Sequence, residues 1–254
     1  MTAASPLRQM GRIAALLLIS LLALQLFFVA RIAIMAVIDP QSTTFQRSEA
    51  WRLLGERGRL DWRQQWVADE RIAATLKRAV IASEDAAFTD HGGVEWDAIE
   101  RAWDRNQRAE ARAEQRNNVN PVENGGRPRV EPKVVGGSTI TQQLAKNLFL
   151  SGERTPLRKA QEFALTLALE ACLSKRRILE IYLNNVEWGE GVFGAQAAAQ
   201  NYYRLDASQL GAHPAARLAV MLPAPKRFEK RPGSPYVVGR AATVVARMGA
   251  VELP

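Results

Sequence analysis

The sequence predicts a mainly α-helical protein with one helix that crosses a membrane near the N-terminus. Three observations predict this fold class. A long apolar run lies near the start of the chain, several later segments combine helical periodicity with N-terminal capping residues, and strand patterns are scarce. With 254 residues, 47% of them hydrophobic, the chain can form one domain with a sizeable core, or one domain plus a small lobe.

Composition narrows the classes of function. The formal net charge of +8 favours anionic partners such as nucleic acid, an acidic membrane face or a phosphorylated substrate. The single cysteine, Cys172, excludes an intrachain disulfide. Two histidines and one cysteine are too few for a structural zinc site, and no zinc-binding spacing occurs.

The apolar run begins at Ile13 and continues to Ala30, interrupted only by Ser20 and Gln25. As a helix it would span roughly 27 Å, about the thickness of the hydrocarbon layer of a bilayer. Apolar character resumes after Arg31 and lasts to Ile38. We therefore expect a transmembrane anchor over residues 13–38.

Arg8 and Arg12 precede the run without any acidic residue, which places residues 1–12 in the cytoplasm. The alternative is a cleaved signal peptide, but the run is long for one and lacks an Ala-x-Ala site directly after it. Asp39-Pro40 then breaks any helix, and the remainder would lie on the far side of the membrane.

Asp69 to Phe88 carries an apolar stripe at helical spacing, which predicts an amphipathic helix. On this helix Glu84 falls on the flank of the stripe, whereas Asp85 points nearly opposite its centre. A carboxylate against apolar surface can have a raised pKa and act as a general base, which makes Glu84 the candidate base. Asp85 is better placed to hold a neighbour or a cation. The alternative is that both carboxylates simply solvate a surface helix.

The segment 107–135 alternates Arg and Glu and then becomes rich in Asn, Gly and Pro, with almost no large apolar residue. We expect a flexible, solvated insertion there, because such a composition cannot form a core.

Two glycines then lead into Thr139-x-x-Gln142, the spacing of a capping box that starts a helix. The first turns of this helix offer free N–H groups, hydroxyls and amides, with Lys146 further on, which makes it a plausible anion or sugar cradle. Ordinary helix starts have the same spacing.

Thr155-Pro156 opens the next predicted helix as N-cap and first-turn proline. Arg158 and Lys159 lie at the positive end of its dipole, which is unfavourable unless an anion binds there. Glu162 is one turn from Arg158, its obvious partner. The residues that follow, to Leu173, are apolar on nearly every face and predict a buried central helix.

Further helices are expected near the C-terminal end of the chain. They cover residues 175–184, 194–203 and 215–222.

Four segments in order carry a family resemblance. They are Glu84-Asp-x-x-Phe88-x-x-His91, Gly137-Ser-Thr-Ile-Thr-Gln-Gln-Leu-Ala-Lys-Asn147, Arg158-Lys-x-x-Glu162 and Lys175-x-x-Ile-Leu-Glu-x-Tyr-Leu-Asn184. This set resembles the central motifs of the peptidoglycan glycosyltransferases, the chain-polymerising domain of class A penicillin-binding proteins, and Leu222-Pro-x-Pro225 resembles a fifth. The likeness covers roughly residues 45–235, with 236–254 as a C-terminal segment. No transpeptidase signature follows, so the monofunctional, single-pass form is the best match.

The resemblance implies a lysozyme-like α-helical fold with a small membrane-associated lobe. It also implies a reaction in which a lipid-linked glycan chain is transferred to lipid II, forming a β-1,4 bond with inversion and releasing undecaprenyl diphosphate. The catalytic domain would lie on the outer face of the bacterial cytoplasmic (inner) membrane. Cell-division or elongation proteins are possible further partners.

The site residues follow from the same motifs. Glu84 would be the base, and Glu162 would orient Arg158 and Lys159 or support the leaving group. Residues expected to bind substrate are Asp85, Phe88, His91, Thr139, Gln143, Lys146, Asn147, Arg154, Arg158 and Lys159. No tightly bound cofactor is expected, although the family often works with magnesium or manganese at the diphosphate.

The sequence departs from the family at two places. The insertion 107–135 is longer than in relatives, and Pro214 and Ala224 stand where relatives often have Glu and Asn or Gln. Three other functions fit the sequence less well. A lysozyme-type hydrolase would need a protonated acid and have no use for the cations around Glu162. A non-catalytic membrane scaffold would not need both glutamates. Nucleic-acid binding is disfavoured, because the basic residues lie in site motifs of an exported chain.

Overall fold

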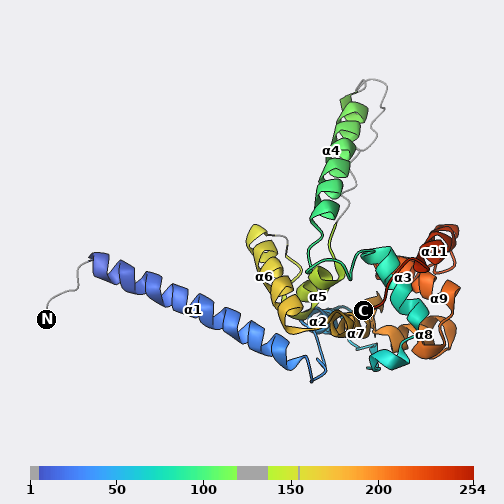
Figure 1. Ribbon diagram of the computed structural model, residues 1–254, viewed down its shortest axis with the longest axis horizontal. Helices are drawn as coiled ribbons and strands as arrows, with labels where there is room; N and C mark the ends of the chain where they lie inside the picture. The colour runs from blue at the N-terminus through green and yellow to red at the C-terminus, as the bar shows by residue number, and fades with distance from the viewer. Residues whose placement is uncertain (1–5, 119–136, 154) are drawn as a thin grey trace.

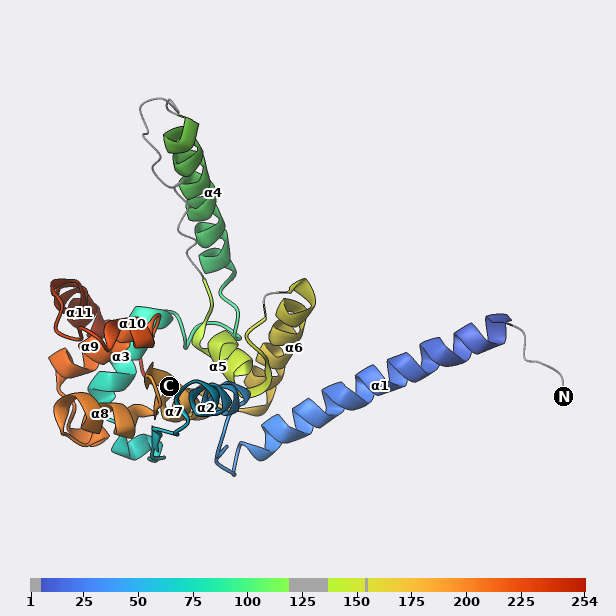
Figure 2. The ribbon, with the colours of Figure 1, turned by 180° about the vertical axis from the view of Figure 1, so that it is seen from behind.

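The computed structural model describes residues 6–118, 137–153 and 155–254. Within them the chain forms the helices α1 to α11, two short 3₁₀ turns and one small sheet. Figure 1 shows a body of short helices from which α1 (Pro6–Ile34) and α4 (Trp96–Asn118) project in different directions. The view from behind shows the same arrangement (Figure 2). The predicted mainly α-helical class is confirmed.

Helix α1 contains the predicted membrane span. Its segment Arg8–Ile34 has a mean hydropathy of 2.7 over its most apolar window, and no residue of that window is buried. The helix ends at Ile34, earlier than the expected anchor end at residue 38, and a turn follows. Near its C-terminal end it packs against α6 (Pro156–Cys172). There Gln25 and Gln161 exchange two hydrogen bonds of 2.9 and 3.2 Å.

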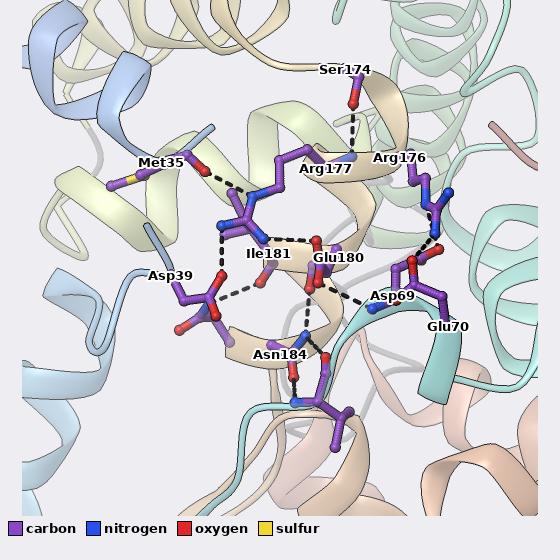
Figure 3. Close-up of polar contacts among 12 residues, drawn as sticks. Met35, Asp39, Asp69, Glu70, Ser174, Arg176, Arg177, Glu180, Ile181 and Asn184 are labelled. Atoms are coloured by element: carbon purple, nitrogen blue, oxygen red, sulfur yellow. Dashed lines mark hydrogen bonds and ion pairs between the residues drawn. The ribbon is translucent and has the colours of Figure 1, made fainter. Parts of the chain in front are cut away.

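The chain that leaves α1 is tied to α7 (Lys175–Asn185) by Arg177. As Figure 3 shows, this guanidinium donates to the Met35 carbonyl oxygen at 2.8 Å and to Asp39 at 2.6 Å, and it is oriented by Glu180 at 2.7 Å. Arg177 is largely shielded from solvent, so these charge-assisted bonds are stronger than surface ion pairs. The anchor is therefore joined to the body through a defined polar contact.

The core lies between α3 (Ala74–Glu84), α5 (Ile140–Phe149), α7, α9 (Ala212–Met221) and α11 (Pro235–Met248). Leu76, Leu144, Ile181 and Leu218 are at most 1% exposed, and burying each side chain of this size contributes about 1.5–3 kcal/mol. Helix α11 packs against α3 and α9, so the packed core continues beyond residue 235.

A three-stranded sheet lies beside the helices. It has the order β1-β3-β2, with β1 (Arg63–Gln64) parallel to β3 (Val192–Phe193) and β2 (Glu187–Gly189) antiparallel to it. Gly194 connects β3 to α8 (Ala195–Tyr203) with φ +84°, and a Cβ there would lie 2.6 Å from the Asn184 carbonyl oxygen. A glycine is therefore required at this junction. Helix α2 (Thr44–Arg57) packs on α5, and the short α10 (Pro225–Phe228) packs on β2.

Helix α6 differs from its prediction. The sequence predicted burial on nearly every face from Phe163 to Leu173, but Leu167 is 46% exposed and Phe163 36%. Only the face that carries Glu162 and Leu165 is buried. The prediction was wrong because an all-round apolar helix fits either a protein core or a lipid environment, and its composition alone does not distinguish them.

Two other predicted segments were also wrong in part. The single helix over 69–88 is a 3₁₀ turn at Asp69–Arg71 followed by α3, which ends at Glu84. Residues 107–118 of the expected flexible insertion form the second half of α4. The rest of that insertion up to residue 135 lies outside the described residues.

Candidate active site

A cleft of about 620 Å³ lies between α2, α5, the N-terminal turns of α6 and the segment that precedes α10. Six of the residues predicted to act in the site line it: Gln143, Lys146, Asn147, Arg158, Lys159 and Glu162. Arg154 lies outside the described residues. The structure thus brings together side chains from two motifs that are separate in the sequence.

Glu84 is the last residue of α3. It is connected to the cleft lining by a hydrogen bond from Gln143. Gln143 Nε2 donates to Glu84 Oε2 at 3.0 Å, while the hydroxyl of Tyr182 donates to Gln143 Oε1 at 2.9 Å. Tyr182 is 1% exposed. Because the tyrosine fixes the oxygen end of the amide, the NH₂ end faces the carboxylate.

The surroundings of Glu84 raise its pKa above that of an ordinary glutamate. Burial raises its pKa, the hydrogen bond from Gln143 lowers it in part, and the negative charge of Asp85 raises it further. Burial, with the charges of Glu84 and Asp85, also raises the pKa of Tyr182 well above its usual value. The Tyr182 hydroxyl therefore stays protonated and remains a donor.

Asp85 does not point outward as predicted. It leaves the helix with φ −162° and ψ 74°, so the helical-wheel geometry does not apply to it, and it is 4% exposed. One carboxylate oxygen meets His91 Nε2 at 2.8 Å and the other accepts from the Ile140 N–H at 2.9 Å. The expectation that it holds a neighbour is fulfilled by these contacts, which fix the start of α5.

Thr139 and Phe88 also lie within the supporting structure. Thr139 forms the predicted capping box with Gln142, and its hydroxyl donates to the Gly93 carbonyl oxygen at 2.6 Å. Phe88 is fully buried, with the Lys175 ammonium 4.6 Å from its ring centroid. Asp85, His91, Thr139 and Phe88 are therefore placed behind the cleft, not in its lining.

Glu162 holds the two cations of the first turns of α6. It is 3% exposed, and it accepts from Arg158 Nη1 at 3.1 Å and from Lys159 Nζ. The Lys159 side chain is 53% exposed and the Arg158 side chain 17%. The carboxylate thus holds positive charge at the cleft wall, where the helix dipole also favours an anion.

One group of described residues has metal-ligand geometry. Asp85, His91 and Glu95 each offer a donor atom within 4.8 Å of the others. However, His91 Nδ1 accepts from the Gly93 N–H at 3.0 Å, its Nε2 is engaged by Asp85, and Glu95 pairs with Arg101 at 2.6 Å. These donors are committed to protein partners, so the group does not fit a resident metal ion.

Sequence reasoning missed several lining residues. Phe45 and Glu49 come from α2, and Glu187 opens β2. None belongs to a stretch with a distinctive spacing. Tyr182, in contrast, is part of the quoted segment Lys175–Asn184, and that signal could have identified it.

Comparisons with known proteins identify the family of the chain. The family model described as Transglycosylase matches residues 52–115 and 126–249. The biosynthetic peptidoglycan transglycosylase of Burkholderia pseudomallei (strain K96243) is 52% identical over 233 residues, which cover 92% of this chain and 83% of that protein. The protein of the same name from Paraburkholderia phytofirmans is 48% identical over 250 residues, covering 98% and 95%. The chain therefore belongs to the peptidoglycan transglycosylase family.

Proposed function

We propose that this protein polymerises lipid II into linear glycan strands for the bacterial cell wall. It transfers the lipid-linked glycan chain to the 4-hydroxyl of lipid II, forms a β-1,4 bond with inversion, and releases undecaprenyl diphosphate. The observation that carries the proposal is a desolvated carboxylate, Glu84, hydrogen-bonded to Gln143 of the cleft lining, with a cation cluster on Glu162 in the same lining. The relatives are named biosynthetic peptidoglycan transglycosylases, which supports the same substrate class.

Glu84 acts as the general base. Its carboxylate takes the proton of the acceptor 4-hydroxyl as that oxygen attacks the anomeric carbon of the donor. Its raised pKa makes it a stronger base than an ordinary glutamate, while the Gln143 hydrogen bond favours the ionised form that takes up the proton. A positioned base of this kind contributes about 10²–10⁴-fold to the rate.

The cations hold the leaving group. When the bond between the anomeric carbon and the diphosphate breaks, both electrons go to the phosphate oxygen. Arg158, Lys159 and Lys146 line the cleft and can stabilise that charge, so no protonated acid is needed. Glu162 orients Arg158 and Lys159 through its two carboxylate oxygens.

The membrane supplies both substrates. The protein is a single-pass protein of the inner membrane, with its N-terminus in the cytoplasm and the cleft on the outer face. The apolar span of α1 and the basic Arg8 and Arg12 before it support this orientation. The exposed apolar residues Leu157 and Phe163 on α6, whose first turns line the cleft, support a position of the cleft near the lipid.

We also propose that a divalent cation, magnesium or manganese, assists at the diphosphate and arrives with the substrate. The commitment of Asp85, His91 and Glu95 to protein partners supports this reading over a resident metal. Chelation should then lower the rate without lowering the melting temperature of the substrate-free protein.

The test is polymerisation of lipid II by the purified full-length protein in detergent. We expect long glycan strands from the wild type, at least a hundredfold loss of rate in Glu84→Gln, and no loss of melting temperature in that variant. Glu70→Gln, at a side chain that is 70% exposed and outside the cleft lining, is the matched control and should keep full activity. Undiminished product from Glu84→Gln would refute the mechanism.

A further inference from the structure

Glu187 is a buried carboxylate in the cleft wall that the mechanism does not use. It is the first residue of β2, is 6% exposed and lines the cleft. Its Oε1 atom is buried and has no hydrogen-bond partner among the described residues. Buried polar atoms in folded proteins are nearly always hydrogen-bonded, so this carboxyl group has the capacity to bond a group that enters the cleft.

The neighbouring charges do not satisfy this oxygen. The Lys226 ammonium lies 3.6 Å from Glu187 Oε1, beyond hydrogen-bond distance, and donates instead to Glu49. Glu49 also accepts from Arg52 Nε at 2.9 Å, so it is well neutralised. The Lys226 ammonium is thus oriented toward Glu49 rather than toward Glu187.

The same surroundings determine how Glu187 titrates. Burial raises the pKa of Glu187 to about 7, the charge of Lys226 opposes this, and the carboxylates of Glu49 and Glu229 add to it. Burial raises the pKa of Tyr202, from α8, and the charge of Glu187 is one of the smaller causes of the same shift. Near neutral pH the Glu187 carboxyl therefore exists in both forms, one that accepts hydrogen bonds and one that also donates.

We propose that Glu187 binds a neutral hydrogen-bonding group of the glycan, a ring hydroxyl or an acetamido N–H, in the cleft. The proposal rests on the proposed function and adds a residue that recognises the sugar. A neutral group fits better than an ion. The carboxylates of Glu49 and Glu229 repel an anion, and the Lys226 ammonium 3.6 Å from Glu187 Oε1 repels a cation.

The position of Glu187 separates its role from that of the cation cluster. Arg158 and Lys159 enter the cleft from α6, whereas Glu187 enters it from β2. The charged neighbours of Glu187 belong to other elements, Glu49 to α2 and Lys226 to α10. One part of the cleft lining is therefore cationic and suited to a diphosphate. The other is built around a carboxyl group and suited to a carbohydrate.

The experiment compares Glu187→Ala, Glu187→Gln and Glu190→Ala in initial rates against lipid II concentration. Glu190 lies three residues further along the same hairpin, pairs with Arg52 and Arg57, and does not line the cleft. We expect Glu187→Ala to raise KM about tenfold, the loss of roughly one hydrogen bond to a charged group, with kcat within about twofold. Glu187→Gln should restore KM, and Glu190→Ala should leave it unchanged.

Melting temperatures distinguish binding from a structural role. Glu187→Ala should melt no lower than the wild type, because it removes an unsatisfied buried group. An unchanged KM, or an unfolded Glu187→Ala protein, would overturn the assignment of Glu187 while leaving the proposed function intact. A wild type that makes no polymer would overturn the proposed function itself.

Discussion

Gln143 donates a 3.0 Å hydrogen bond to Glu84, and its amide is held in that orientation by the Tyr182 hydroxyl at 2.9 Å. The three side chains come from α5, α3 and α7. The proposed base is therefore positioned by a chain of hydrogen bonds that crosses the core. Burial and this hydrogen bond act on the pKa of Glu84 in opposite directions.

Replacing Gln143 should move the pH dependence of the reaction. In Gln143→Leu the carboxylate loses a donor that favours its charged form, so the pKa of Glu84 rises further above its usual value. Because the base acts when deprotonated, the acid limb of kcat/KM shifts to higher pH. We expect the rate to fall more on the acid side of the profile than on its alkaline side.

Tyr182→Phe is the matched comparison for Gln143→Leu. It keeps the ring in the core and the amide in place but removes the hydroxyl that orients the amide. The acid limb should move in the same direction by a smaller amount. The measurement is a pH–rate profile of lipid II polymerisation between about pH 5 and 9. A limb that stays in place in Gln143→Leu would show that Gln143 does not control the base.

Removing Lys159 should weaken binding of the diphosphate-linked donor. Lys159→Ala deletes one of the two cations on Glu162, and Arg158 still pairs with that buried carboxylate at 3.1 Å. We expect a loss of about tenfold in donor affinity, and a melting temperature within about 2 °C of the wild type, since a half-exposed ion pair contributes at most about 1 kcal/mol.

The control for Lys159 is another lysine that is exposed and outside the cleft lining. Lys230→Ala removes the same charge there and should leave affinity unchanged. Binding is measured by titrating a diphosphate-linked donor analogue into each protein at two salt concentrations. Equal affinities for Lys159→Ala and the wild type would rule out the cation cluster as the donor site.

Helix starts were predictable from the sequence because their signals are local. Thr139 with Gln142, and Thr155 with Pro156, begin α5 and α6 at the residues expected. A cap depends on side chains within one turn, so residues distant in the chain have little influence on it. The mainly α class and the apolar α1 were predictable for the same reason.

Contacts between distant segments were not predictable from local pattern. Asp85 turns inward because α3 ends one residue earlier and the Ile140 N–H is available to it. Glu187 lines the cleft because α2 and α10 pack beside β2. No spacing in the sequence encodes either arrangement, since each depends on segments at least 35 residues apart that only the tertiary fold brings together.

Shortening α4 should leave the body of the protein intact. Beyond its first turns this helix projects away from the body, as both ribbon views show. Replacing residues 107–135 by a short Gly-Ser linker should keep the melting temperature within about 2 °C of the wild type, because the described part of this segment, residues 107–118, lies in the projecting half of α4. Thermal unfolding followed by circular dichroism tests this. A large drop would show that the segment stabilises the fold.

Adding a methyl group at Gly93, which lies behind the site, should lower the stability of the protein. The φ of Gly93 is +85°, and a Cβ would lie 2.7 Å from Thr166 Cγ2 and 2.8 Å from Glu170 Cγ. Gly93→Ala should therefore cost about 2–4 kcal/mol, from backbone strain and from the displacement of α6. Activity should fall as well, because the Gly93 carbonyl oxygen holds Thr139 at the start of α5.

The adjacent Gly92 provides the control for Gly93. A Cβ at Gly92 meets no atom within 4 Å, and its φ lies outside the left-handed region, so Gly92→Ala should change stability by less than about 0.5 kcal/mol. Denaturant unfolding of the two variants isolates the effect of the contact from that of losing a glycine. If both variants unfolded at the same denaturant concentration, the packing of Gly93 against Thr166 would not be what joins the loop to α6. If only Gly93→Ala were destabilised and its activity fell with its stability, the loop would be confirmed as the support that keeps α5 and α6 in register across the cleft.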